Sequence, residues 1–508
     1  MTGPLSRRRA RYALVIALGL LVTAAVPGEA SGPEGNAVAA VWNDPPAASP
    51  STSPPPPSNT PFVGWSDPAG VGKPYGDKVT GLLTFRGNAT RTYYGTGPVP
   101  RNQPELRWQF PRTDRLCSLS VDQRGPTQWC GSGFTGQPAL FERDGRTWMV
   151  VGAFDRALHF LDADTGERII PSFPTGDIIK GSVTIDPDGY PLVYSGSRDN
   201  YLHIVSFDRG RPTELWKLSA KAVSPTKWND DWDASPLIIN DYLFEGGENS
   251  QFHIVKLNRS YGPDGKVRIN PKLVFHTPGW DSQLLRDIGD SNVSIEGSAA
   301  IYGNTLYFAN SGGLVQGWDL SSLAKGGTPK RVFRFWTGDD TDAAMVVDEA
   351  GALYVGVQYE RGTARSKAVG QMMKLDPSKP DNPLVWKLDD RGGHPAGIWG
   401  TPALYQDIVV FVTTGGSVIG VDRMTGAERW RIRLGAQAWP SPVIVDGVLM
   451  VADCDGDLHA YDVAETTEAP TPLWTLETGS CIESTPAVWE GNLYFGTWGG
   501  RILSFGVR

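Results

Sequence analysis

Apolar and polar residues along this chain fall into short segments separated by turn residues, a pattern typical of β-strands rather than helices. The clearest example extends over residues 399–434, where four such segments follow one another. A continuous apolar run, Ile408–Val412, is followed by the tight turn Gly415-Gly416 and a further apolar segment at 418–421. Another turn then leads to the segment 430–434. The pattern predicts a unit of four short β-strands.

Looser copies of this unit recur along the chain and can be aligned by the opening of their first strand. The openings lie at 137–140, 181–184, 235–238, 297–300, 343–346, 401–404, 441–444 and 485–488. The repeat length is roughly 40–60 residues, and four strands per repeat at such a period are the signature of a β-propeller. The eight openings therefore predict eight blades.

The outermost strand of the last blade is predicted to come from the other end of the sequence. Most copies end in a strand with an apolar or tryptophan anchor, such as Trp386, Trp430 or Trp474, but the eighth copy ends at 501–505 without one. A matching segment centred on Trp108 stands before the first copy. We expect an all-β, eight-bladed β-propeller of four-stranded blades, closed by this N-terminal strand so that no edge stays unpaired.

Two turns share the pattern Asp-x-x-Thr-Gly, at 162–166 and 422–426. Asp and Thr side chains can bond to the turn backbone there, and glycine supplies a positive φ. With Trp430 after the second turn and the Ser/Thr-Pro openings, the pattern resembles the pyrroloquinoline quinone (PQQ) repeat. That repeat builds the eight-bladed propellers of quinoprotein dehydrogenases and the cofactor-free propeller of the outer-membrane protein assembly lipoprotein. The resemblance covers roughly 84–508 and implies the fold, because the motif itself carries no chemistry.

The N-terminal region has the composition of a targeting segment followed by a linker. A basic stretch at 7–11 precedes the apolar run 13–26, which is short for a membrane span. We expect a cleaved secretory signal or an uncleaved membrane anchor at 1–30. Residues 31–80 are rich in Pro, Ser and Ala, which predicts a disordered linker. The propeller is expected to occupy 81–508.

Charge and cysteine content narrow the function classes. The formal net charge of -8 gives no support for nucleic-acid binding, which needs a basic surface. Export implies an oxidising compartment, in which the four cysteines are expected to pair rather than stay free. Cys117 with Cys130 would close a local loop, and Cys454 with Cys481 would tie successive repeats.

The loops that lead into each first strand surround the central funnel of a propeller. Here these loops offer a set of polar and aromatic side chains: Lys180, Trp232, Asp233, Glu296, Asp342, Trp399, Trp439 and Glu483. The family resemblance implies one use for such a set, since quinoprotein dehydrogenases hold Ca²⁺ with a Glu and an Asn, keep an Asp as base, and place Arg or Lys near the quinone. Glu296 as metal ligand, Asp342 as catalytic base and Lys180 could fill these roles.

In that arrangement Trp399 or Trp439 would stack on the quinone, while Trp232, Asp233 and Glu483 would line the ligand site. Two features of the dehydrogenases are missing from the sequence: adjacent cysteines that would form a disulfide on the quinone, and a Cys-x-x-Cys-His haem motif. The alternative is a funnel whose polar residues face solvent and hold no cofactor.

The loop 227–233 is the densest cluster of acidic and aromatic residues, with Trp228 and Trp232 flanking an asparagine and two aspartates, and Asp233 following. Such a cluster can bind a cation, a sugar ring by stacking, or a peptide. The alternative is a turn whose tryptophans wedge between blades. If the turn 246–250 shares its face, Glu248 and Asn249 would extend the cluster.

Histidines recur at one position of the third strand of several repeats. The same column of the repeat is occupied by His159, His203, His253, Gln316, Met373, Ile419, His459 and Leu503. A position that varies in this way is a packing position, and one histidine per blade does not make a shared metal site. His394 is the histidine expected on a funnel loop.

These observations lead us to expect an exported, non-catalytic, monomeric β-propeller that binds or scaffolds a cell-envelope protein or cell-wall component. It would be secreted or attached to the membrane only through its N-terminal segment. One alternative is a quinoprotein-type dehydrogenase with PQQ and Ca²⁺ in the funnel. Another is a glycan-binding module that uses the loop 227–233.

Overall fold

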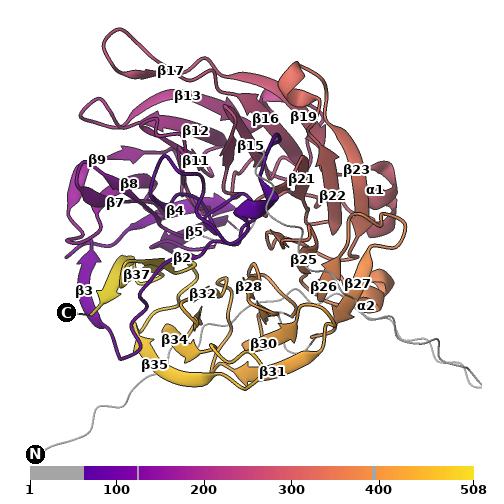
Figure 1. Ribbon diagram of the computed structural model, residues 1–508. Coiled ribbons are helices and arrows are strands. Elements are labelled where there is room, and N and C mark those ends of the chain that lie inside the picture. Colours follow the sequence, from indigo (N-terminus) through magenta and orange to yellow (C-terminus); the bar gives the residue numbers. More distant parts are fainter. Residues whose placement is uncertain (1–61, 123–124, 135, 392–395, 508) are drawn as a thin grey trace, which may run out of the picture. The chain divides into compact units, whose positions relative to one another are not determined.

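The computed structural model describes residues 62–122, 125–134, 136–391 and 396–507, and these residues form eight four-stranded antiparallel blades around a central channel (Figure 1). In every blade the first strand lies next to the channel and the fourth lies outermost. The predicted all-β, eight-bladed propeller is confirmed. The signal or anchor predicted at 1–30 and the linker as far as residue 61 lie outside the described residues.

The strands of the first four blades follow the repeat order. Blade 1 contains β6 (Ala139–Arg143), β7 (Arg146–Ala153), β8 (Ala157–Asp162) and β9 (Arg168–Pro174). Blade 2 contains β10 (Thr184–Ile185), β11 (Leu192–Gly196), β12 (Tyr201–Ser206) and β13 (Thr213–Ser219). Blade 3 contains β14 (Leu237–Ile239), β15 (Tyr242–Gly246), β16 (Gln251–Lys256) and β19 (Lys272–Pro278). Blade 4 contains β20 (Ala300–Tyr302), β21 (Thr305–Phe308), β22 (Leu314–Asp319) and β23 (Lys330–Trp336).

The remaining blades have the same order. Blade 5 contains β24 (Val346–Val347), β25 (Leu353–Gly356), β26 (Met372–Leu375) and β27 (Leu384–Leu388). Blade 6 contains β28 (Ala403–Tyr405), β29 (Ile408–Val412), β30 (Ser417–Asp422) and β31 (Glu428–Arg433). Blade 7 contains β32 (Val443–Val445), β33 (Val448–Ala452), β34 (Asp457–Asp462) and β35 (Thr471–Glu477). Blade 8 contains β36 (Ala487–Trp489), β37 (Asn492–Thr497), β38 (Arg501–Gly506) and the N-terminal β3 (Glu105–Phe110).

A few elements stand outside this repeat. Two inner strands, β1 (Gly81–Leu82) and β2 (Gly95–Thr96), line the channel, and two hairpins, β4–β5 (Cys117–Asp122, Gly125–Cys130) and β17–β18 (Ser260–Tyr261, Val267–Arg268), project from blades. The α-helices of the described ranges are α1 (Ser282–Ile288) and α2 (Ala364–Val369). None of these described helices is long and apolar enough to span a membrane.

The N-terminal strand β3 closes the ring as predicted, because it pairs antiparallel with β38 along the outer edge of blade 8 (Figure 1). Trp108 of β3 is buried and donates its indole N–H to the carbonyl of Ala163, at 2.8 Å. A Cβ on Gly166 would stand 2.6 Å from the Trp108 ring. The ring therefore rests on the Asp-x-x-Thr-Gly turn of blade 1, which explains why this turn ends in glycine. Trp386 rests in the same way on Gly426 of blade 6.

The channel is closed from one side by the segment 81–97. Its backbone carbonyls accept hydrogen bonds from the first strands of blades 2, 4 and 5: Leu83 from Ile185, Ala89 from Ile301 and Thr90 from Val347. Two fully buried arginines in this segment bind backbone carbonyls around the channel. Arg86 donates to Pro402, at 2.6 Å, and to Pro442, and Arg91 donates to Ser235 and Ala299. We call residues 81–97 the plug.

The folded unit begins earlier than the sequence suggested, at residue 62 rather than 81. Trp65 is buried, with its ring 5.2 Å from that of Tyr242, and its indole N–H donates to the carbonyl of Leu320. Tyr75 is buried and bonds the backbone of Ile238 through its hydroxyl. The low apolar content of 62–80 suggested a linker, but two aromatic anchors suffice to fix this segment to blades 3 and 4 on the plugged side.

Both predicted disulfides are present, Cys117–Cys130 and Cys454–Cys481, and no described cysteine is free. The first joins the ends of the β4–β5 hairpin, where the two cysteines face each other across the ladder. The second joins the turn after β33 to the loop that enters blade 8.

Candidate functional site

The funnel opens on the side of the ring opposite the plug, where the loops into each first strand meet the turns between second and third strands. The predicted funnel residues all lie on these loops, and the structure brings most of them together. Acidic side chains from the loops of blades 3 to 5, together with Lys180 from the loop into blade 2, occupy one half of the funnel. Aromatic side chains from the loops of blades 1, 6, 7 and 8 occupy the other half.

Lys180 stands within the acidic half and joins two of its carboxylates. Its Nζ lies 2.5 Å from Asp233 Oδ2 and 3.3 Å from Glu248 Oε1. Burial alone would lower the pKa of Lys180, but the negative charges of Asp233 and Glu248 outweigh it and hold that pKa well above its usual value. Lys180 therefore carries a permanent ammonium charge. Glu248, on the β15–β16 turn, lies on the same face as the loop 227–233. The turn 246–250 therefore extends the acidic cluster of that loop, as expected for a shared face.

Glu296 lies beside this group, since possible ligand atoms of Asp233, Glu248 and Glu296 are all within 4.8 Å of one another. Burial raises the pKa of Glu296 well above its usual value, and the nearby Asp342 raises it further, whereas Lys180 opposes the rise. Ser294 donates its hydroxyl to Glu296 at 2.8 Å. Such hard oxygen donors suit Ca²⁺, but the Lys180 ammonium already lies among them.

Asp342 forms the boundary between the acidic and the aromatic halves. Its carboxylate accepts hydrogen bonds from Ser311 Oγ and Gln358 Nε2, both at 2.9 Å. Burial raises the pKa of Asp342 even though Asp340 and Ser311 lower it through hydrogen bonds. Asp340 is itself buried, with a pKa raised by burial and by the charge of Asp342. Burial thus raises the pKa of both aspartates.

In the aromatic half, four rings contact one another in sequence, and three of them line a small cavity. Ring centroids are separated by 5.7 Å between Phe134 and Trp399, 5.8 Å between Trp399 and Trp439, and 6.1 Å between Trp439 and Trp498. The enclosed cavity has a volume of about 10 Å³ and is lined by Phe134, Trp399, Gly400, Trp439, Ser441, Asp342 and Glu483. A space of this size holds one water molecule.

Glu483 closes the aromatic half from below. It accepts hydrogen bonds from the backbone N–H of Phe134 and from the indole N–H of Trp498, both at 3.0 Å. Burial raises the pKa of Glu483, and these two donors counteract part of the rise. Asp342 and Glu483 thus present two buried carboxyl groups to one aromatic cavity.

The prediction that Trp232 contacts a ligand is corrected by its position. Trp232 is fully buried beneath the funnel, and its ring centroid lies 4.9 Å from that of His253. It wedges between blades 2 and 3, which is the alternative that the sequence had left open. Trp228 on the same loop is 44% exposed.

Beneath Trp232, blade 3 carries a carboxyl group where the other blades carry apolar residues or serine. Glu245 faces His253 across the β15–β16 pair. The corresponding second-strand residues are Val151, Ser195, Phe308, Val355, Phe411, Val451 and Phe495. Neither Glu245 nor His253 has a hydrogen-bond partner for its side chain in the described part of the chain. Burial raises the pKa of Glu245 well above its usual value, against the opposing charge of Arg91.

We predict that Glu245→Gln raises the melting temperature at pH 8 and leaves it unchanged below pH 4.5, the ordinary pKa of a glutamate. In the folded protein Glu245 retains its proton to higher pH than in the unfolded chain, so wild-type stability falls as the pH rises above that value. Glutamine keeps the shape of the neutral acid and removes this loss. Melting curves across the pH range measure it, and equal melting temperatures at pH 8 would contradict it.

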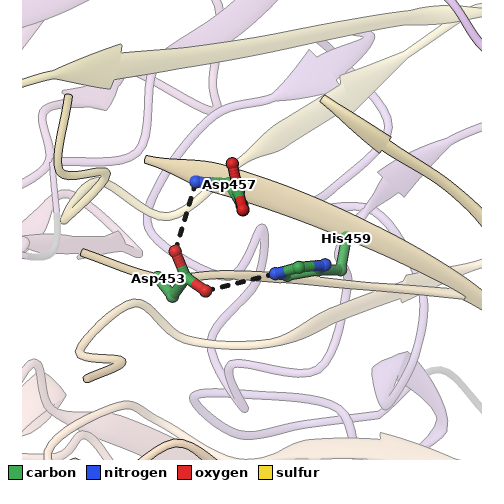
Figure 2. Close-up of side chains that lie close together, drawn as sticks. All are labelled: Asp453, Asp457 and His459. Atoms are coloured by element: carbon green, nitrogen blue, oxygen red, sulfur yellow. Dashed lines mark hydrogen bonds and ion pairs between the residues drawn. The ribbon is translucent and has the colours of Figure 1, made fainter. Parts of the chain in front are cut away.

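Three of the four third-strand histidines are hydrogen bonded to neighbouring turns, and His253 is the exception among the described residues. Each of three bonds an aspartate of the turn before its strand: His159 with Asp155 at 3.0 Å, His203 with Asp199 at 3.1 Å, and His459 with Asp453 at 3.2 Å. Figure 2 shows the last pair, where Asp453 also accepts the backbone N–H of Asp457.

The side chains of Asp453, Asp457 and His459 are close enough to ligate one metal ion. We nevertheless assign a structural role to this group, because the same pairing ties turn to strand in three blades. His394 lies outside the described residues.

Among the described residues, the cavity between the funnel aromatics is too small for PQQ, and the carboxylates next to Glu296 already hold an ammonium group. The cavity of about 10 Å³ is far smaller than the roughly 300–1,000 Å³ of a pocket for a drug-sized ligand. The Lys180 ammonium bonds Asp233 and Glu248, two of the three carboxylates that would surround a cation next to Glu296.

Several funnel residues were not predicted from the sequence. Asp340 stands two residues before the predicted Asp342, and Phe134 lies on the entry loop of blade 1, so the loop position could have identified both. Arg198, which bonds Asp231 at 2.7 Å, and Trp498 lie on turns between second and third strands. Apart from the turn 246–250, the turns between second and third strands carried no predicted funnel residue, although they reach the same face.

Comparison with known proteins supports the fold. Residues 374–508 match the family model described as outer membrane protein assembly factor BamB. No protein of curated function matches the sequence. The crystal structure of BamB from Moraxella catarrhalis is similar with a TM-score of 0.52 and 15% identity, over 80% of this chain and 100% of that one.

Two quinohemoprotein alcohol dehydrogenases are also similar. ADHIIG from Pseudomonas putida HK5 has a TM-score of 0.57 at 11% identity, and the enzyme from Comamonas testosteroni has 0.54 at 13%; each match covers 84% of this chain and 80% of that one. At such identities the likeness shows the fold alone. The resemblance to PQQ-like propellers is confirmed. The fold does not distinguish a cofactor-free propeller from a quinone-binding one, so that question depends on the side chains of the funnel.

Proposed function

We propose that this PQQ-like propeller is an exported, non-catalytic protein that binds a partner of the cell envelope through its funnel face. The observation that carries the proposal is the small size of the cavity between the funnel aromatics. Trp399 contacts both Phe134 and Trp439, and the cavity that these rings line has a volume of about 10 Å³. A dehydrogenase of this fold needs that space for its cofactor, whereas a binding protein does not.

The funnel face carries the features of a docking surface. Trp228 and Trp498 are 44% and 40% exposed and stand on loops of this face, as does the β4–β5 hairpin, where Leu119 is 60% exposed. The hairpin is fixed by its disulfide and by the hydrogen bond from Ser118 Oγ to the carbonyl of Phe154, at 2.6 Å. Exposed aromatic and apolar side chains on a rigid support are typical of protein-binding surfaces.

Two further observations support a location outside the cytoplasm. The basic and apolar pattern of residues 7–26 is that of an export signal or anchor. The two disulfides belong to an oxidising compartment. The likeness to an outer membrane protein assembly factor favours a protein partner over a cell-wall polymer.

Site-specific photo-crosslinking in the producing cells tests the proposal. A photoreactive phenylalanine in place of Trp498 should give discrete adducts with an envelope protein. The matched control replaces Met424, which is 71% exposed on the turn between β30 and β31, on the plugged face. Adducts from both positions alike, or none from the funnel face, would contradict the proposal.

A further inference from the structure

The cavity in the aromatic half of the funnel combines three features that together select a ligand. It is bounded by aromatic rings, it contains two buried carboxyl groups, and it has the volume of one water molecule. We propose that this cavity binds a primary ammonium group between Phe134, Trp399 and Trp439, held by Asp342 and Glu483. The inference rests on the proposed binding function and names the chemistry that the funnel face recognises.

The aromatic rings favour a cation. The faces of Trp and Phe rings carry negative electrostatic potential and attract ammonium groups within about 6 Å of the ring centroid. Phe134 already makes such a contact, since Lys180 Nζ lies 5.6 Å from its centroid. The edge-to-face arrangement of Phe134, Trp399 and Trp439 builds a wall of rings around the cavity.

The carboxyl groups supply hydrogen-bond acceptors, and a cation beside them favours their charged form. Asp342 and Glu483 are 7% and 6% exposed, and neither forms an ion pair within 4 Å in the part of the chain that the structure describes. Lys180 is engaged by Asp233 and Glu248, and Arg361 stands nearer to Asp340, at 3.9 Å. An incoming ammonium would therefore complete a charge pair that the protein leaves open at this point.

The described part of the funnel has more acidic than basic side chains. Seven carboxyl groups of described residues face or border it: Asp231, Asp233, Glu248, Glu296, Asp340, Asp342 and Glu483. The described cations among them are Lys180, Arg198 and Arg361. The buried atoms Asp233 Oδ1 and Asp340 Oδ1 have no hydrogen-bond partner within the described ranges. This surplus of acceptors favours a donor-rich cation over an anion or a neutral ligand.

Size decides which cation. An ammonium group is close to a water molecule in size and offers three N–H donors, which Asp342 and Glu483 can accept. A trimethylammonium group is several times larger and offers no donor, so the cavity excludes it. The ligand is either the lysine side chain of a protein partner or a small free alkylamine, and both present the same head group.

Calorimetric titration of the full-length protein tests the inference with four probes. The first pair is n-butylammonium and butyltrimethylammonium, and the second is a blocked tripeptide with a central lysine and its norleucine analogue. We expect n-butylammonium or the lysine peptide to bind, and each larger or uncharged analogue to bind at least about tenfold more weakly. If the lysine peptide binds more than about tenfold more tightly than n-butylammonium, the ligand is a lysine side chain of a protein partner. If n-butylammonium binds more than about tenfold more tightly than the peptide, the ligand is a free amine.

Two substitutions locate the binding. Glu483→Gln keeps an acceptor for Phe134 and Trp498 but removes the charge, and we expect it to weaken amine binding about tenfold or more. Glu468→Gln, on an exposed turn of the plugged face, is the matched control and should bind as the wild type does. Equal affinity of Glu483→Gln and Glu468→Gln would overturn the inference.

The comparison of probes needs no variant, so it decides the inference even if Glu483→Gln does not fold. No binding of either amine, or equal binding of the trimethylated probe, would overturn it. Such a result leaves the proposed function intact when photo-crosslinks still form at the funnel face. Loss of the crosslinks would instead contradict the proposed function.

Discussion

Trp108→Ala will lower the free energy of unfolding by about 3–5 kcal/mol, the usual cost of truncating a buried large aromatic residue. Trp108 lies on β3, the strand that closes the ring, and its ring packs between Tyr494, with centroids 6.0 Å apart, and the turn at Gly166. The substitution also leaves the carbonyl of Ala163 without its indole donor. Because both ends of the chain meet here, the loss weakens closure as well as one blade.

Leu106→Ala is the matched control, since Leu106 lies on the same strand but is 52% exposed. It should cost less than about 1 kcal/mol. Urea unfolding measures both values, and hydrogen exchange on β38 shows whether closure is affected. Equal stabilities of the two variants, or unaltered protection of β38 in Trp108→Ala, would contradict closure by β3.

Arg86→Met will cost about 3–6 kcal/mol, because two hydrogen bonds from a charged donor are lost inside the channel. Arg86 is fully buried, bonds the carbonyls of Pro402 and Pro442, and lies with its guanidinium 4.2 Å from the Tyr94 ring centroid. Methionine fills similar volume but leaves both carbonyls unpaired. The substitution thus tests whether the plug holds blades 6 and 7 together.

Arg112→Met serves as the control, since the Arg112 side chain is 76% exposed and its ion pair with Glu167 contributes little. Its unfolding free energy should stay within about 0.5 kcal/mol of the wild type. Thermal and urea unfolding of both variants measure the difference. If the two variants have equal free energies of unfolding, the hydrogen bonds of Arg86 do not hold blades 6 and 7 together.

The ring could be predicted from the sequence because each blade repeats its own local signals. Three local signals mark the strand positions within a blade: the Ser/Thr-Pro openings, the Asp-x-x-Thr-Gly turns and the outer tryptophans. Because the eighth copy lacked its fourth strand, these signals also predicted that the strand with Trp108 pairs with β38. The third-strand column was predicted correctly for the same reason, as His253 and Ile419 occupy equivalent ladder positions.

The plug and the funnel could not be predicted in the same way. Arg86 and Arg91 bind backbone carbonyls, and such contacts leave no pattern of complementary side chains in the sequence. In the funnel, loop position identified Lys180 and Asp342, but it did not show that Lys180 would bond Asp233. It also placed Trp232 in the funnel, although burial between blades removes that ring from ligand contact.

The central claim is that the funnel of this propeller binds a partner and holds no quinone. Purified protein is incubated with excess PQQ and Ca²⁺, separated from free quinone by gel filtration, and assayed for quinone absorbance and for dye reduction with a panel of alcohols. Since the cavity between the funnel aromatics is far smaller than a quinone, we predict that no quinone absorbance elutes with the protein and that no dye is reduced. One quinone per chain, together with alcohol-dependent dye reduction, would contradict the account.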